Sequence, residues 1–335
     1  MPEQFRERYL RKSRKLTDIF PIAAIISFVL ALIGQAISLA IGHALGLSSG
    51  GEIDPNLPGF LYMTLLYLSF ISIWLIIALA IAIPPANRRM FKDILPNGRG
   101  NSLRGIGIGI LLGFSCNAIC ILLSVLLRDV GLSFAEFNIV NALILYLAVM
   151  VQSGAEEIVD RLFLYEKLRR RYKSPWVAII GNALVFMSMH LLSPGITVIS
   201  CMQIALIGVI FSLFVYYFDS LWAAIFFHTT WNYTQNILFG CPNSGIVSAY
   251  SIFKLDAASW GPFFDPVFGV EGSIGANVIL AALLVGILVY AKKKNLPGQD
   301  LWADLNEPAP EAPAPEAPAG PETNHTPRHM NSAVE

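Results

Sequence analysis

The chain has 335 residues, of which 55% are hydrophobic and only 14% are charged, whereas about 25% are charged in a typical soluble globular protein. Its 23 Lys and Arg residues balance its 23 Asp and Glu residues, so no global field exists to recruit nucleic acid or an acidic partner. These values exclude an ordinary cytosolic enzyme and a nucleic-acid-binding protein. They predict that the lipid bilayer surrounds much of the chain.

Eight apolar stretches approach or exceed the length of about 20 residues that a helix needs to cross a bilayer. No charged residue occurs within 105–127 or 174–218, as expected where a charge at the centre of a span costs about 3 kcal/mol. The sequence therefore predicts an all-α fold, a polytopic transmembrane helix bundle of about eight spans. The predicted spans are 19–45, 60–83, 103–127, 138–168, 175–192, 196–218, 221–239 and 274–290.

The basic residues predict the orientation of these spans. Of the 23 Lys and Arg residues, 19 lie in segments that would be inside if the N-terminus is cytoplasmic, and only Arg128 and Lys254 lie in outside loops. By the positive-inside rule, both termini are then cytoplasmic. The first apolar stretch, of about 28 residues, is too long for the core of a signal peptide, which predicts a retained first span.

The composition divides the chain into two regions. Residues 306–322 consist mostly of Pro, Ala and Glu, a composition that cannot bury a hydrophobic core. We therefore expect a membrane-embedded domain over 1–297 and a disordered cytoplasmic tail over 298–335.

Two further features concern contacts between segments. The outside loop 241–273 is rich in Gly, Pro and aromatic residues, and its length is compatible with a partly ordered lid or interfacial element or with a plain loop. Gly109 and Gly113 form a G-x-x-x-G pattern in the third span, which predicts the close approach of a neighbouring helix.

The fourth predicted span carries an unusual group of charges. Glu157 and Arg161 are four residues apart and can form an ion pair along the helix, whereas Glu156 points about 100° away and has Asp160, a like charge, as its own neighbour at four residues. Glu156 is therefore the candidate general base. The alternative is that the span ends near Gly154 and that the charges lie at the membrane interface.

Three other polar side chains lie in apolar surroundings. His190 ends the fifth span, and His228 lies in the seventh span with Asn232 one turn later on the same face. Each histidine could be a packing residue, as we expect for His43 near the end of the first span. Together with Glu156, however, these side chains could activate a water molecule and stabilise an oxyanion.

These residues form three motifs that resemble a known family. Residues 156–161 fit E-E-x-x-x-R, residues 186–190 fit F-x-x-x-H and residues 228–232 fit H-x-x-x-N. Their order is similar to that of the CPBP family, the CAAX-processing and bacteriocin-processing (Abi) intramembrane proteases, with a motif core over 138–240. The chain departs from the family pattern at Asp160, where an apolar residue is usual, and at Leu162, where Gly is common.

The resemblance implies a CAAX-protease-like core and an intramembrane endopeptidase in a bacterial plasma membrane, acting on a membrane-embedded or lipidated peptide. Glu156 and His190 would activate water, and His228 and Asn232 would stabilise the oxyanion. Supporting roles would fall to Glu157, Arg161, Phe186 and Asp160.

Metal use remains open at this point. The reaction could proceed with the carboxylate and histidines alone. Alternatively, Glu156, His190 and His228 could hold one divalent metal ion such as zinc, with water as the fourth ligand.

Two other functions are compatible with the same residues. The intramembrane acids, Arg161 and the histidines could form the relay of a proton- or ion-coupled transporter, although we find no repeated half-sequence. The chain could also be a non-cleaving membrane scaffold or immunity protein, for which Asp160 is the indication.

Overall fold

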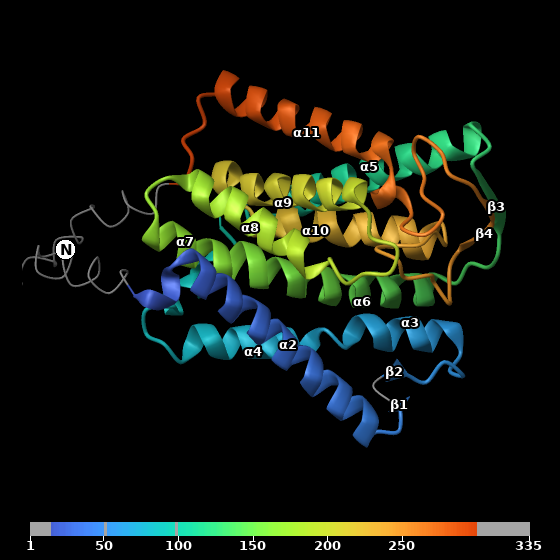
Figure 1. Cartoon of the computed structure of the whole chain (residues 1–335), viewed down its shortest axis with the longest axis horizontal. Coiled ribbons are helices and arrows are strands. Elements are labelled where there is room, and N and C mark those ends of the chain that lie inside the picture. Colours follow the sequence, from blue (N-terminus) through green and yellow to red (C-terminus); the bar gives the residue numbers. More distant parts are fainter. Residues whose placement is uncertain (1–14, 50–51, 98–99, 300–335) are drawn as a thin grey trace, which may run out of the picture.

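The computed structural model describes residues 15–49, 52–97 and 100–299, so the predicted tail lies almost entirely outside the described residues. Helices dominate it, and most of them run side by side along the long axis of the molecule (Figure 1). The α-helices are α2 (Phe20–Ala44), α3 (Gly59–Leu68), α4 (Ile71–Ala82), α5 (Leu103–Leu126), α6 (Ile139–Glu157), α7 (Tyr165–Arg171), α8 (Pro175–Met189), α9 (Val198–Phe218), α10 (Leu221–Asn232) and α11 (Ile274–Lys293).

Short elements join or extend these helices. Two π-helices, η3 (Ile158–Leu164) and η4 (Tyr233–Leu238), follow α6 and α10, and 3-10 turns form η1 (Leu16–Asp18), η2 (Arg88–Asp93) and η5 (Val270–Gly272). The strands are β1 (Ser48–Ser49), β2 (Glu52–Ile53), β3 (Val130–Phe134) and β4 (Phe253–Ala258).

Helical segments occupy all eight predicted spans, and six of the described stretches are long and apolar enough to cross a membrane. The chain is thus a polytopic all-α bundle and an integral, multi-pass membrane protein. The fifth predicted span is the exception in length, because α8 has only 15 residues and rises about 22 Å, less than the hydrocarbon thickness of about 30 Å. The seventh span contains only 12 residues of α-helix before η4 begins.

Polar side chains fix where the helices begin. The side chain of Asn138 accepts hydrogen bonds from the first amides of α6, Ser220 does the same for Ala223 of α10, and Ser102 for Gly105 of α5. Such N-caps satisfy amides that the first helical turn leaves without partners. Because α6 and α10 carry the first and third motifs, these caps also fix the register of the motif side chains.

The predicted close helix approach is confirmed between α5 and α10. A Cβ atom on Gly109 would lie 2.6 Å from the Ala223 carbonyl oxygen, and one on Gly113 would lie 2.4 Å from that of Phe227. Both distances are far shorter than a van der Waals contact. Glycine at these positions therefore allows α5 to support the back of the helix that carries His228.

The loop between η4 and α11 is ordered. Its strand β4 pairs antiparallel with β3, with an irregularity between Gly131 and Leu132. Phe264 and Phe268 of the loop are buried in the main hydrophobic core, whereas Trp260 is 67% exposed. The loop is thus partly ordered rather than a plain loop. Its short strand β4, and the strand β3 with which it pairs, were not predicted from the sequence.

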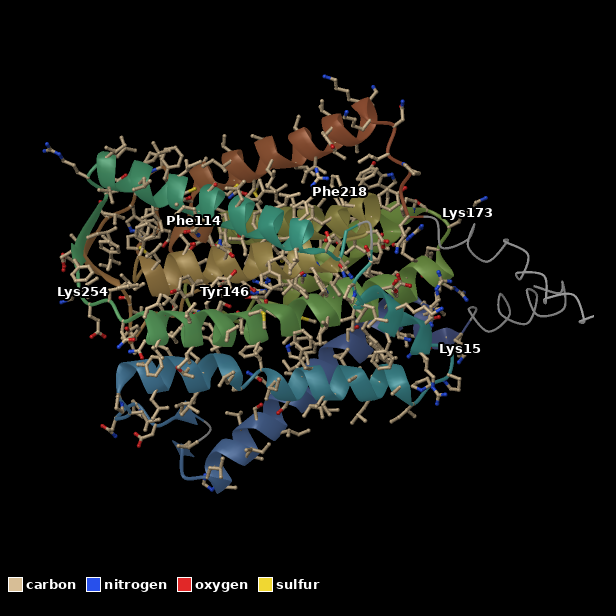
Figure 2. The ribbon with its side chains drawn as sticks, turned by 180° about the vertical axis from the view of Figure 1, so that it is seen from behind. Lys15, Phe114, Tyr146, Lys173, Phe218 and Lys254 are labelled. Atoms are coloured by element: carbon tan, nitrogen blue, oxygen red, sulfur yellow. The ribbon has the colours of Figure 1, made fainter. Side chains whose placement is uncertain are left out.

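The basic side chains lie mainly at one end of the bundle. Lys15 and Lys173 are at the same end, and Lys254 is at the opposite end (Figure 2). Ser133 pairs with Lys254 in the strands β3 and β4 and therefore lies at the end opposite to Lys15 and Lys173.

We expect reporter fusions to place the basic end of the bundle in the cytoplasm. A cytoplasm-dependent reporter should be active when fused after Asn97 or Arg171 and inactive after Ser133 or Ser248, because basic loops are retained inside. The measurement is reporter activity normalised to the amount of fusion protein. A fusion after Ser248 that is active in the cytoplasm would contradict this orientation.

Candidate active site

The four predicted catalytic side chains line one cavity. It has a volume of about 410 Å³ and lies between α2, α3 and α4 on one side and α6, α8 and α10 on the other. Glu156, His190, His228 and Asn232 all face it, together with Phe186 and apolar side chains of α2. The three motifs, which are up to 76 residues apart in the chain, therefore form a single site.

The Glu157 and Arg161 side chains form the predicted ion pair, with 3.2 Å between Arg161 Nη1 and Glu157 Oε1 and no exposed surface on either side chain. The guanidinium also lies 4.2 Å from the ring centre of Phe186 and 5.3 Å from that of Phe211. A buried charge requires such compensation. The ion pair thus lies inside the bundle, in a helical segment that continues past Gly154 to Arg171.

His228 connects the two glutamates. Its Nδ1 atom is 2.9 Å from Glu157 Oε1, and its Nε2 atom is 3.7 Å from Glu156 Oε2. Because the ion-paired carboxylate of Glu157 can only accept, Nδ1 carries the proton of this hydrogen bond. The imidazole also stacks on Phe211, with ring centres 5.4 Å apart. His228 is therefore held so that Nε2 faces Glu156.

Glu156 has one engaged and one free carboxylate oxygen. Its Oε1 atom accepts a hydrogen bond of 2.5 Å from Gln152 Nε2. Its Oε2 atom is itself buried and accepts no hydrogen bond from the described residues, whereas the side chain as a whole is 20% exposed. This partial exposure in the cavity distinguishes Glu156 from the fully buried Glu157.

His190 enters the cavity from the end of α8. It follows the last residue of the helix, and its Nδ1 atom lies 2.9 Å from the Phe186 carbonyl oxygen. Since a carbonyl oxygen only accepts, Nδ1 carries the proton and Nε2 of the neutral ring keeps a free lone pair. Because α8 ends at Met189, the residue that follows it lies in the same cavity as Glu156 and His228.

Asn232 makes more contacts than the sequence suggested. Its amide group donates to Gln152 Oε1 at 3.1 Å and to Ser153 Oγ at 3.3 Å, and its Oδ1 atom accepts from Asn243 Nδ2 at 3.2 Å. Gln152 in turn binds Glu156, so Asn232 helps to fix the candidate base. Gln152 could have been found from the sequence, because it precedes Glu156 by four residues on the same helix face.

The loop between η4 and α11 supplies a buried carboxylate that the sequence analysis did not assign to the site. Glu271 accepts hydrogen bonds from Trp231 Nε1, from Asn243 Nδ2 and from both the amide and the hydroxyl of Ser244. Burial raises the pKa of Glu271, and the hydrogen bonds from Ser244 oppose that shift. No local spacing in the sequence indicates these contacts.

Asp160, which departs from the family pattern, is also buried. Its Oδ2 atom is 3.9 Å from Arg161 Nη1, and neither carboxylate oxygen accepts a hydrogen bond from the described residues. Asp160 belongs to η3 rather than to the face of α6 that lines the cavity. It therefore adds a second acid beside Arg161 without lining the candidate site.

The variant Asp160→Asn should keep or raise the melting temperature. It removes a buried carboxylate that accepts no hydrogen bonds from the described residues, while Glu157 continues to compensate Arg161. The measurement is thermal unfolding of the purified protein in detergent beside the unchanged chain. A fall of several degrees would instead show that Arg161 depends on Asp160 for charge compensation.

A metal ion does not fit the side chains as they are placed. Among the described residues, no three His, Cys, Asp or Glu side chains are arranged so that they could hold one. This includes the candidate set of Glu156, His190 and His228, in which Glu156 Oε2 and His228 Nε2 are 3.7 Å apart. No step of the reaction proposed below is therefore assigned to a metal.

Comparison with protein families gives a match over the segment that contains the motifs. Residues 138–234, which contain all three motifs, match the family described as type II CAAX prenyl endopeptidase Rce1-like. Comparisons with curated proteins and with solved structures give no match. The matched segment covers α6 to α10 and hence every helix that supplies a candidate catalytic side chain. The segment 138–234 of this membrane protein is therefore similar to the CPBP/CAAX proteases, in agreement with its three motifs.

Proposed function

We propose that the chain is an intramembrane endopeptidase that hydrolyses a peptide bond in the cavity between α2 and α10. The observation that supports this most directly is the pair formed by Glu156 Oε2 and His228 Nε2, 3.7 Å apart in the cavity. The remaining polar atoms of both side chains are occupied, by Gln152 and by Glu157. Such a fixed acid and base pair is suited to water activation and charge stabilisation.

In the proposed reaction, Glu156 accepts a proton from a water molecule as the water oxygen attacks the peptide carbonyl carbon. His228, when both ring nitrogens are protonated, donates from Nε2 to the developing oxyanion while Glu157 retains its hydrogen bond to Nδ1. The proton taken up by Glu156 then passes to the leaving nitrogen as the carbon–nitrogen bond breaks. His190 Nε2 assists Glu156 in accepting the proton of water.

In this proposal the main role of Asn232 is to position other side chains rather than to stabilise the oxyanion. Both of its amide hydrogens already donate to α6, so it would have to release one of these bonds to stabilise an oxyanion. We therefore propose His228 as the main hydrogen-bond donor to the oxyanion and Asn232 as a secondary donor. In the resting site Asn232 keeps Gln152, and through it Glu156, in position.

The cavity wall supports an apolar substrate. Side chains of α2 and α4, including Phe28, Leu32 and Ile73, form the side opposite Glu156. An extended peptide with apolar or lipidated residues would bury this surface. The proposed substrate is thus a membrane-embedded or lipidated peptide, cleaved by a protein with both termini in the cytoplasm, in a bacterial plasma membrane.

The test is cleavage of a defined peptide panel by the purified protein in lipid vesicles. The panel should contain prenylated, acylated and transmembrane peptides of matched sequence, with products identified by mass spectrometry. The proposal expects cleavage by the unchanged chain and cleavage that is about 100-fold slower, or slower still, by Glu156→Gln. Ion flux into the vesicles without any cleavage would favour the transporter instead.

The same assay tests metal dependence. The proposed route expects chelator-treated protein to keep its activity and elemental analysis to find no stoichiometric zinc. About one zinc ion per chain, with activity lost on chelation and restored by zinc, would establish the metal-assisted route through Glu156, His190 and His228.

A further inference from the structure

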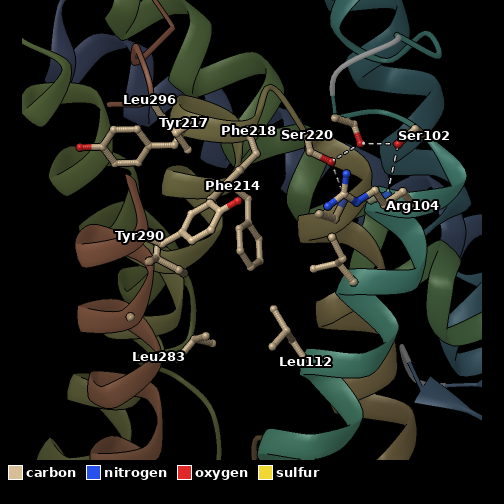
Figure 3. A pocket seen from close by; sticks show the side chains of 16 residues that line it. Ser102, Arg104, Leu112, Phe214, Tyr217, Phe218, Ser220, Leu283, Tyr290 and Leu296 are labelled. Atoms are coloured by element: carbon tan, nitrogen blue, oxygen red, sulfur yellow. Dashed lines mark hydrogen bonds between the residues drawn. The ribbon is translucent and has the colours of Figure 1, made fainter. Parts of the chain in front are cut away.

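A second cavity lies on the other side of α10 from the candidate active site. It has a volume of about 500 Å³ and is enclosed by α5, α9, α10 and α11. None of its lining residues belongs to the first cavity. Figure 3 shows Arg104, Ser102 and Ser220 at one end of it and Leu112 and Leu283 towards the other. The cavity is thus amphipathic along its length.

The long part of this cavity fits a hydrocarbon chain. From Arg104 to Leu112 along α5 it extends about 12 Å, compared with about 15 Å for half of a bilayer core. Its walls there are aliphatic and aromatic, and they include Phe214 and Ile287. Because α5 and α11 both qualify as membrane spans, a lipid can reach the cavity directly from the bilayer.

The polar end carries positive charge. Arg104 is exposed, and no ion pair or hydrogen bond involves its side chain within the described residues. The N-termini of α5 and α10 meet beside it, since the hydroxyl of Ser220 contacts the carbonyl oxygen of Gly100 at 2.7 Å. Lys292 and Lys293 in the last turn of α11 add exposed positive charge at this end. Two helix N-termini and an arginine favour an anion.

We propose that this cavity binds one anionic phospholipid, with an acyl chain between α5 and α11 and the phosphate at Arg104. The apolar walls select a lipid chain, and the positive end selects a negatively charged head group over a zwitterionic one. This inference is independent of the proposed peptidase activity, because the two cavities share no residue. The lipid would thus lie on one side of α10, and the candidate active site lies on the other side.

The test uses native mass spectrometry of the full chain with dioleoyl phosphatidylglycerol and, separately, dioleoyl phosphatidylcholine. The proposal expects one tightly bound phosphatidylglycerol per chain. The variant Arg104→Gln should bind phosphatidylglycerol about fivefold more weakly. Its binding of phosphatidylcholine should not change. The matched control is Arg128→Gln, which changes an exposed arginine at the opposite end of α5. Glycerol 3-phosphate should not compete, because it lacks the acyl chains.

A second pair of variants tests the apolar part. A side chain added at Gly286 would enter open space at the cavity wall, and one added at Gly107 would enter open space elsewhere on the helix surface. Gly286→Leu should therefore reduce phosphatidylglycerol binding, and Gly107→Leu should not. Melting temperatures in lipid-free detergent establish that each variant is folded.

Three results would overturn the proposal. Equal binding of the two phospholipids, or binding that neither Arg104→Gln nor Gly286→Leu changes, would show only general lipid contact. Competition by glycerol 3-phosphate alone would indicate a soluble anion site. A neutral farnesylated peptide that binds in a Gly286-dependent manner, while phosphatidylglycerol does not, would make the cavity a substrate site.

Discussion

Glu156→Gln should lower the rate of peptide hydrolysis by about 100-fold or more while the protein remains folded. Glutamine keeps the shape of the side chain, and its amide oxygen can still accept the hydrogen bond that Gln152 donates to Oε1. What is lost is a carboxylate able to accept the proton of water at the position of Oε2. The measurement is the initial cleavage rate of whichever panel peptide the unchanged chain hydrolyses.

Glu136→Gln is the matched control for this variant. Glu136 is exposed in the segment that precedes α6, so the same chemical change there should leave both the rate and the melting temperature unchanged. A Glu156→Gln protein that cleaves as fast as the control would refute the assignment of the base. A variant that fails to fold would contradict the view that Glu156 is needed for chemistry alone.

Glu157→Gln should act through stability as well as activity. It leaves the Arg161 guanidinium buried with only Asp160 nearby at 3.9 Å, and breaking a buried ion pair by removing one partner costs about 3–5 kcal/mol. It also removes the carboxylate that orients His228. We therefore expect a lower yield, a lower melting temperature and a loss of activity together, measured beside Glu136→Gln.

A double variant separates these two effects. Adding Arg161→Met to Glu157→Gln removes the unpaired charge and keeps an apolar side chain near Phe186 and Phe211. The double variant should recover much of the lost stability but not the activity, because His228 still lacks its partner. Recovery of activity as well would show that Glu157 serves only to neutralise Arg161.

The sequence predicted the parts of this molecule that depend on local patterns. Apolar length and charge placement located all eight helical segments, and the four-residue spacing of Glu157 and Arg161 predicted their contact. The G-x-x-x-G pattern predicted a close neighbour, though not that this neighbour is α10. Each of these signals acts within one helix, where geometry is fixed by the backbone.

What the sequence could not give depends on contacts between distant segments. The bond between Glu157 and His228 joins residues 71 positions apart, and nothing near either residue indicates it. The π-helical turns of η3 and the pairing of β3 with β4 are likewise set by packing. The apolar sequence pattern does not distinguish an α-helix from a π-helix. Strands as short as β3 and β4 have only weak sequence patterns.

Hydrogen bonds of the buried Glu271 connect the candidate site to the loop between η4 and α11. Four consecutive hydrogen bonds run from Glu271 through Asn243, Asn232 and Gln152 to Glu156. Every link joins two side chains, so a continuous series of hydrogen bonds connects the loop to the candidate base. An antibody fragment raised against residues 256–260, which are exposed and do not line the cavity, should therefore lower the turnover rate without competing with the substrate.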